Sequence, residues 1–227
     1  MTDDAPTTAP ARSRWLLWVL VALAIGALAF AIGRFSTFGP VASVALPGTS
    51  SAEAGFARDM QVHHTQAIEM AMEIYRKTDD EELRVLSYDI ATGQAGQRGE
   101  MFDWLVQWGL PQSGGPMMAW MAAGGGDHEH GGAEPGASLS DEEARAAMGM
   151  ASDAELDALA AASGQDADCL FLELMIRHHE GAVPMADAII DLGSEPRVLQ
   201  VAGAISAGQT AEIDAMKSMQ QRLGCTG

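Results

Sequence analysis

The chain has 227 residues and a formal charge of −18 at pH 7, and 48% of its residues are hydrophobic. This length allows one or two domains with a sizeable core. The acidity argues against nucleic acid or anionic lipid as a partner and favours cations, although it also helps to keep an extracytoplasmic protein soluble.

The first predicted element is an apolar helix near the N-terminus. Residues 15–33 carry no charge, and as a helix they span about 28 Å, close to the hydrocarbon thickness of a bilayer. Arg12 and Arg14 precede this run, which favours a cytoplasmic N-terminus and an extracytoplasmic remainder. We expect a cytoplasmic tail and transmembrane anchor over residues 1–34. The alternative is a signal peptide cleaved near residues 43–45, which would leave a secreted protein.

Residues 35–52 are rich in Ser, Gly and Pro and are predicted to be a linker. Beyond it the chain repeats itself, because FARDMQVHHTQAIEMA at residues 56–71 corresponds to FLELMIRHHEGAVPMA at residues 171–186. The same offset, without a gap, pairs Gln94 with Gln209 and Gly109 with Gly224. This indicates an internal duplication over residues 53–224, with repeat one at 53–110, a spacer at 111–168 and repeat two at 169–224.

Each repeat is predicted to form a helical hairpin. In repeat one, apolar and histidine side chains between Phe56 and Ile74 fall on one helical stripe about 120° wide. A second helix is expected from about Glu81 to Trp108. In an antiparallel hairpin, Gln94 and Gln97 of the second helix face the histidines of the first, and repeat two has Gln209 and Glu212 at these positions. We therefore predict an all-α fold: an N-terminal transmembrane helix, then a four-helix bundle of two duplicated hairpins related by an approximate two-fold axis.

The repeated histidine pairs are the leading candidate for a metal site. The pairs are His63-His64 and His178-His179, and Met60 and Met175 lie about one turn before them. Burying four imidazoles is costly unless each has a partner, and a metal ion supplies one. Imidazole and thioether ligands together favour copper, above all the cuprous state, with other transition metals as alternatives. A structural hydrogen-bond network joining the hairpins is the competing interpretation.

The spacer carries further candidates. Two short helices are expected to open at Ser140 and at Ser152, the latter with a capping box completed by Glu155, and the second to close at Gly164. Before them lies a glycine-rich loop with side chains that suit an accessory metal site: Met117, Met118, Met121, His128 and His130. An unstructured hydrophilic loop is the alternative.

Three motifs carry a family resemblance: the repeated M-x-x-H-H-x-x-A-x-x-M-A, the GMASDAEL segment at residues 149–156, and WLVQWGL at residues 104–110. The chain resembles domain-of-unknown-function family 305 from about residue 53 to residue 224. The resemblance implies a ferritin-like helical fold, extracytoplasmic localisation and, as for some members, copper binding and copper tolerance without an enzymatic activity. It adds Met70 and Met185 to His63, His64, His178, His179, Met60 and Met175 as candidate ligands, with Gln94, Gln97, Gln209 and Glu212 around them.

Two other function classes compete with copper sequestration. A structural or sensory helical module on the membrane surface would use the histidines as a hydrogen-bond network. A di-iron oxidase needs Glu-x-x-His pairs and further inward carboxylates, but no Glu stands three residues before any of the four histidines. The sequence does not indicate an oligomeric state.

The two cysteines, Cys169 and Cys225, lie near the two ends of repeat two. In an oxidising compartment such a pair suits a disulfide. An antiparallel hairpin brings the start of one helix near the end of the next, although the register is several residues from ideal. Two free thiols are the alternative.

Overall fold

The computed structural model describes residues 12–36, 46–122 and 139–225. The chain divides into two compact units, residues 1–45 and residues 46–227. All the regular elements of the described residues are α-helices, and no strand occurs among them. The predicted all-α fold class is confirmed.

The first unit contains α1 (Arg12–Ser36). Its stretch Trp15–Arg34 has a mean hydropathy of 2.6, and none of it is buried by other parts of the protein. By length and composition this helix can cross a membrane, but a signal sequence has the same properties. Anchor and cleaved signal both remain consistent with the structure.

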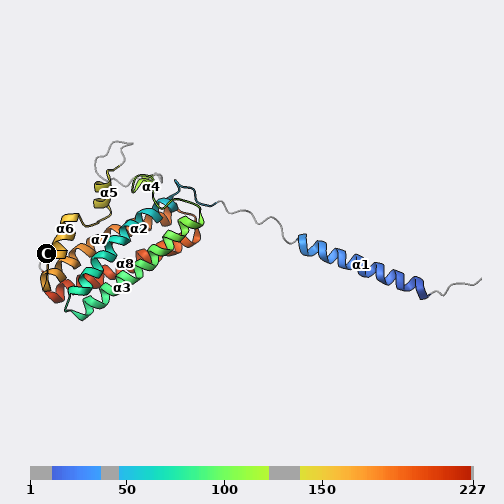
Figure 1. Ribbon diagram of the computed structural model, residues 1–227, viewed down its shortest axis with the longest axis horizontal. Helices are drawn as coiled ribbons and strands as arrows, with labels where there is room; N and C mark the ends of the chain where they lie inside the picture. Colours follow the sequence, from blue (N-terminus) through green and yellow to red (C-terminus); the bar gives the residue numbers. More distant parts are fainter. Residues whose placement is uncertain (1–11, 37–45, 123–138, 226–227) are drawn as a thin grey trace, which may run out of the picture. The chain divides into compact units, whose positions relative to one another are not determined.

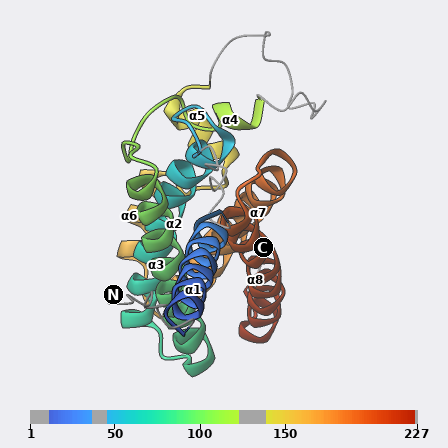
Figure 2. The same cartoon turned by 90° about the vertical axis from the view of Figure 1, so that its right-hand side faces the viewer.

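The second unit is built from two antiparallel hairpins. The first pairs α2 (Ala52–Lys77) with α3 (Glu81–Gln107), and the second pairs α7 (Gly164–Leu192) with α8 (Pro196–Leu223). Each first-hairpin helix begins at a polar cap: Ser51 Oγ accepts from Ala54 N at 3.2 Å, and Asp80 Oδ1 accepts from Leu83 N at 2.9 Å. Figures 1 and 2 show the hairpins side by side, with α2 packed against α7.

The core falls into two apolar clusters along the hairpins. One contains Met60 and Met185, and the other contains Met70 and Met175. Each cluster therefore takes one of these methionines from each hairpin. Because α2 passes from Met60 to Met70, its two histidines lie between the clusters, and the same holds for α7 between Met175 and Met185.

The spacer adds three short helices, α4 (Ala119–Ala122), α5 (Asp141–Ala147) and α6 (Asp153–Ala161). Helices begin after Ser140 and Ser152, as predicted, and both residues form complete capping boxes, of which only the one at Ser152 was predicted. The sequence placed the end of α6 at Gly164, but α6 ends at Ala161 and Gly164 instead begins α7. The sequence analysis did not predict the short helix α4.

Tertiary contacts explain α4. The Trp120 ring packs edge-on against Phe56 at 5.8 Å between centroids, and its Nε1 donates to Asp59 Oδ2 at 2.9 Å. A Cβ atom on Gly55 would lie 2.5 Å from the Trp120 ring, so only glycine fits beneath it. Burial raises the pKa of Asp59, while hydrogen bonds from Met118 N and Trp120 act in the opposite direction.

Candidate metal centre

The four repeated histidines meet in the middle of the bundle. His63 and His64 on α2, and His178 and His179 on α7, each have no exposed surface. The rings of His63 and His178 lie 3.6 Å apart between centroids, at 32° to each other. Within each pair the centroids are 6.3 Å and 6.2 Å apart. The near equality of these two distances reflects the equal spacing of the two histidines along α2 and along α7.

Three of the four imidazoles use Nε2 in a hydrogen bond. His63 Nε2 lies 3.1 Å from the carbonyl oxygen of Met148, and His64 Nε2 lies 2.8 Å from Gln97 Oε1. His179 Nε2 lies 2.7 Å from Glu212 Oε2. Because carbonyl and carboxylate oxygens accept, Nε2 donates in each bond, so Nδ1 is the ring nitrogen that carries the lone pair wherever the imidazole is neutral.

The remaining ring nitrogens have no hydrogen-bond partner among the described residues. They are Nδ1 of all four histidines and, in addition, Nε2 of His178. A buried polar atom without a partner costs roughly 1–3 kcal/mol. The centre of the bundle therefore concentrates unpaired imidazole nitrogens that a metal ion would stabilise.

Burial also sets the protonation state of three of these histidines. Desolvation, and next the neighbouring His64, lower the pKa of His63 to about 3. Desolvation lowers the pKa of His64 to about 4, against the opposing effect of its hydrogen bond to Gln97. Desolvation and the neighbouring histidines hold the pKa of His178 well below its ordinary value. All three rings are neutral at pH 7, the form that binds a metal.

The candidate ligands do not form a site of nitrogen and oxygen ligands alone. Among the described residues, no group of three or more His, Cys, Asp or Glu side chains is arranged to hold a metal ion. The thioethers of Met60, Met70, Met175 and Met185 are all buried in the flanking clusters. Any site at this centre must therefore be completed by sulfur or by a rearrangement of the rings.

The predicted polar partners differ in their roles. Gln97 and Glu212 contact His64 and His179, as the antiparallel register predicts. Gln94 and Gln209 are each 4% exposed, and neither amide has a hydrogen-bond partner in the described structure. These two glutamines face a crevice of about 50 Å³ between α3 and α8.

The spacer reaches the histidines through a segment that the sequence analysis did not assign to the site. A Cβ atom on Gly181 would lie 1.9 Å from the Met148 carbonyl oxygen, and one on Gly149 would lie 2.3 Å from the Arg177 carbonyl oxygen. Gly149 also has a positive φ of 71°. Glycine at both positions thus lets the spacer backbone approach α7 and present the Met148 carbonyl to His63.

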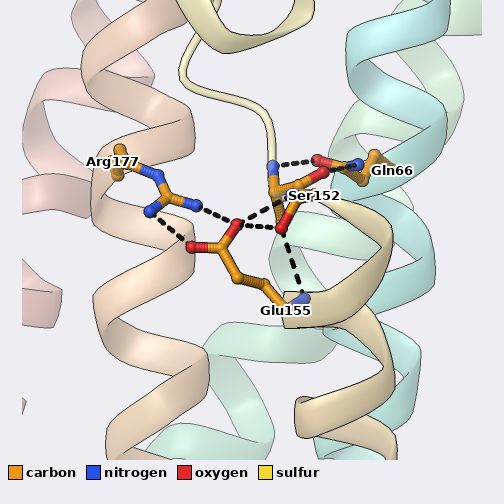
Figure 3. Close-up of polar contacts among 5 residues, drawn as sticks. Gln66, Ser152, Glu155 and Arg177 are labelled. Carbon is orange, nitrogen blue, oxygen red and sulfur yellow. Dashed lines mark hydrogen bonds and ion pairs between the residues drawn. The ribbon is translucent and has the colours of Figure 1, made fainter. Parts of the chain in front are cut away.

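Polar side chains hold this segment in place (Figure 3). Gln66 bonds both backbone groups of Ala151, at 2.8 Å to its oxygen and 2.7 Å to its nitrogen. Glu155, which completes the α6 capping box with Ser152, accepts two bonds of 2.8 Å from Arg177. The GMASDAEL motif that carried the family resemblance therefore fixes a hydrogen-bond acceptor beside the histidine pairs.

The accessory candidates are only partly described. Met117, Met118 and Met121 lie around α4, partly buried against the cluster that contains Met60. His128 and His130 lie outside the described residues. The structure does not bring the three methionines into the histidine centre.

Cys169 and Cys225 form a disulfide with 5.4 Å between their Cα atoms. The bond joins the first third of α7 to the chain just beyond α8. It closes repeat two, and repeat one has no cysteine.

The chain matches the model of the family described as Domain of unknown function (DUF305) over residues 53–220. A DUF305 protein from Streptomyces coelicolor, considered to be secreted, is 37% identical over 79% of this chain and 96% of its own, with a TM-score of 0.67. A DUF305 fragment from Deinococcus radiodurans is 33% identical over 75% of this chain and 96% of its own, with a TM-score of 0.59.

A third similar structure contains metal. CopM in its Cu(I)-bound form is 27% identical over 76% of this chain and 96% of its own, with a TM-score of 0.52. CopM structures with Cu(II) and with silver match at 26–27% identity. A comparison with curated proteins finds no match.

Proposed function

The chain belongs to the DUF305 family, and from that membership and the chemistry of its core we propose that it binds copper outside the cytoplasm, in copper sequestration or tolerance. The observation that carries the proposal is the set of four buried imidazoles whose Nδ1 atoms have no hydrogen-bond partner among the described residues. Imidazole lone pairs in a buried core suit a borderline metal ion.

The hydrogen bonds at the opposite side of the rings support the same proposal. Metal-binding histidines usually donate their other ring N–H to a carbonyl or carboxylate, which fixes the ring and strengthens the ligand. His63, His64 and His179 make such bonds to Met148, Gln97 and Glu212. Their Nδ1 atoms, together with a ring nitrogen of His178, are the donors that we assign to the metal.

The methionines favour copper over harder ions. Met60, Met70, Met175 and Met185 place thioethers on both sides of the histidines along the helices. Thioether and imidazole suit cuprous ion, whereas calcium and magnesium need oxygen ligands. The metal-bound forms of CopM, with Cu(I), Cu(II) and silver, are consistent with this preference in a related bundle.

The apolar α1 helix and the relative considered to be secreted support a location outside the cytoplasm. We propose that α1 anchors the bundle to the membrane. Fractionation of cells that express the full chain tests this point: a soluble product starting near Leu46 would show that the segment is a cleaved signal.

A structural or sensory helical module is the second candidate. It is favoured by the same three histidine hydrogen bonds, which link α2 to the spacer and join the two helices within each hairpin. This candidate gives no role to His178, whose ring nitrogens have no partner in the described structure. The di-iron alternative stays the weakest, because Glu212 is the only carboxylate among the described residues that contacts one of these rings.

The experiment is a cuprous ion titration against a competing chelator. The wild type is compared with His63→Ala/His64→Ala and with His178→Ala/His179→Ala. The reference protein and both double variants carry the same background substitutions, so that the spacer contributes no ligand: His128→Asn, His130→Asn, Met117→Leu, Met118→Leu and Met121→Leu. Circular dichroism verifies that each variant is helical.

We expect each double variant to lose tight binding at the centre completely, because the site draws on both hairpins. Survival of half the binding at unchanged affinity would mean that each hairpin binds alone. Unchanged binding in both variants would mean that the histidines are structural.

A further inference from the structure

The two hairpins leave a crevice where α3 faces α8. It is lined by residues of both helices, among them Asp89, Gly93, Gln94, Gly208 and Gln209, and its volume is about 50 Å³. Gln97 and Glu212 also line it. Since these two side chains hold His64 and His179 through bonds of 2.8 Å and 2.7 Å, the crevice leads to the histidine pairs.

Unpaired amides line this crevice. Gln94 and Gln209 occupy equivalent positions in the two repeats, and each side chain is 4% exposed. Neither the oxygen nor the nitrogen of either amide has a hydrogen-bond partner in the described part of the chain. Buried polar groups are normally paired with protein or water, so a repeated pair of amides without a protein partner suits water or a polar ligand in the crevice. An amide oxygen can replace a water molecule around a cation.

Glycine keeps the crevice open. Gly93 and Gly208 stand inside α3 and α8, where glycine destabilises a helix by about 1 kcal/mol relative to alanine. A Cβ atom at either position would have no neighbour within 4 Å. Close packing therefore does not require glycine at these positions, and larger side chains would project into the free space.

The crevice and the larger hollow on the bundle are lined by different charged side chains. That hollow, of about 370 Å³ between α2 and α3, is lined by Arg58 and Arg98. Neither arginine makes an ion pair among the described residues, and a lining that holds two arginines and no carboxylate is less favourable to a cation than one that holds carboxylates. The crevice instead contains the carboxylates of Asp89 and Glu212.

Ion pairs join α3 and α8 on both sides of the crevice. Arg197 at the start of α8 bonds Glu100, with 2.8 Å between Nη2 and Oε2. Arg222 near the end of α8 bonds both carboxylate oxygens of Asp80, at 2.7 Å and 2.8 Å. The helices are thus tied near their ends, with the crevice between the two ties.

We propose that the crevice between α3 and α8 is the route by which a metal cation reaches the buried histidines, with the amides of Gln94 and Gln209 replacing its bound water. The inference rests on the proposed function, because it concerns access to the same site. It assigns a role to four residues, Gly93, Gln94, Gly208 and Gln209, that metal coordination alone does not explain.

The test fills the crevice and measures the rate of uptake separately from its extent. The variant Gly93→Leu/Gly208→Leu is mixed with silver ion in a stopped-flow instrument, and the final stoichiometry is measured at equilibrium. Gly99→Leu/Gly203→Leu is the matched control, because it changes the same two helices at glycines that do not line the crevice and also have free space around Cβ. A second variant, Gln94→Leu/Gln209→Leu, removes the amides and leaves both glycines.

We expect uptake by the glycine variant to slow by about tenfold or more, as a barrier raised by roughly 1.4 kcal/mol would give. Its final stoichiometry stays that of the wild type, and the control stays within about twofold of the wild-type rate. The glutamine variant also slows, which supports the route even if the glycine variant does not fold. If a folded crevice variant takes up silver at the wild-type rate, and this uptake depends on the histidines, the proposed route is wrong while the proposed function stands. Absence of histidine-dependent uptake in the wild type overturns the proposed function and the route together.

Discussion

The two hairpins have the same geometry but different chemistry at equivalent positions. His64 and His179 both bond a side chain of the following helix, at 2.8 Å and 2.7 Å, but the acceptor is the neutral Gln97 in one repeat and the carboxylate of Glu212 in the other. His63 donates a hydrogen bond to the Met148 carbonyl, whereas its equivalent His178 has no hydrogen-bond partner in the described structure. The spacing of the histidines along each helix therefore fixes where the rings lie, while their hydrogen-bond partners fix which ring nitrogens are free to bind a metal ion.

The largest expected effect concerns acid, which acts on histidines of both repeats. In the folded protein the pKa of His63 is about 3 and that of His64 about 4, whereas the unfolded chain binds protons near pH 6.5. Between these pKa values and pH 6.5 the unfolded state therefore binds more protons than the folded state. The stability that the two buried histidines contribute is complete above pH 6.5 and falls as the pH drops towards 4. The slope is about 1.4 kcal/mol per pH unit for each such histidine, or several kcal/mol in all.

Denaturant titrations of the metal-free protein between pH 7 and pH 4 measure this slope. Replacing His64 by Leu should make the slope of the free energy of unfolding against pH shallower, because one buried neutral histidine is removed. The carboxylates of Asp80 and Glu155 have pKa values lowered to about 2, chiefly by hydrogen bonds from Arg222 and Arg177, so their contribution is lost only below about pH 4.5. Stability that is flat from pH 7 to pH 5 would contradict burial of neutral histidines.

The disulfide gives the next largest difference between the repeats. Cys169 and Cys225 are 56 residues apart in sequence, and closing a loop of that length stabilises a protein by about 4 kcal/mol in the chain-entropy model. We expect Cys169→Ser/Cys225→Ser to lower the free energy of unfolding by about 2–4 kcal/mol. The wild type measured in reductant is the control, and a loss below about 1 kcal/mol would show that the bond contributes little.

A smaller effect separates His63 from His178. His63→Leu leaves the Met148 carbonyl without its donor and should cost about 1–3 kcal/mol. His178→Leu removes a ring that has no hydrogen bond in the described structure, so the metal-free protein should be equally stable or slightly more stable. Thermal and denaturant unfolding of both variants decides the matter, and equal losses would mean that the two rings have equivalent partners.

The smallest effect is expected from making the two repeats alike. Glu212→Gln keeps a hydrogen-bond acceptor for His179 but removes its charge, and Gln97→Glu does the reverse for His64. A charged acceptor makes the imidazole a stronger ligand, so the first change should weaken copper binding by up to about tenfold and the second should strengthen it. Affinities that shift in the same direction would show that the acceptor's charge does not tune the site.

Much of the fold follows from local patterns. The stripe from Phe56 to Ile74 and the caps at Ser140 and Ser152 predict helices that the structure contains. The repeat of the His-His pair, combined with a two-fold bundle, also predicts that the four rings meet. These features depend on residue spacing within one helix or hairpin, which the sequence displays directly.

The unpredicted parts depend on contacts between distant segments. The Met148 carbonyl reaches His63 from 85 residues away, and it does so because Gly181 leaves room on α7. The docking of Trp120 on Gly55 is of the same kind. The GMASDAEL segment was visible as a family motif, and its Ser152–Glu155 capping box as a helix start, but neither was visible as a support for a histidine partner.

The most direct test of the central claim is a cuprous ion competition titration of His178→Leu beside the wild type. His178 is buried and neither ring nitrogen has a hydrogen-bond partner among the described residues, so a structural network keeps the hydrogen bonds of the other three histidines when this ring is replaced. A copper site loses a ligand, and we expect affinity to fall by about tenfold or more while the stability of the metal-free protein is kept. Wild-type copper affinity in a folded His178→Leu protein would contradict a copper site built on the paired histidines.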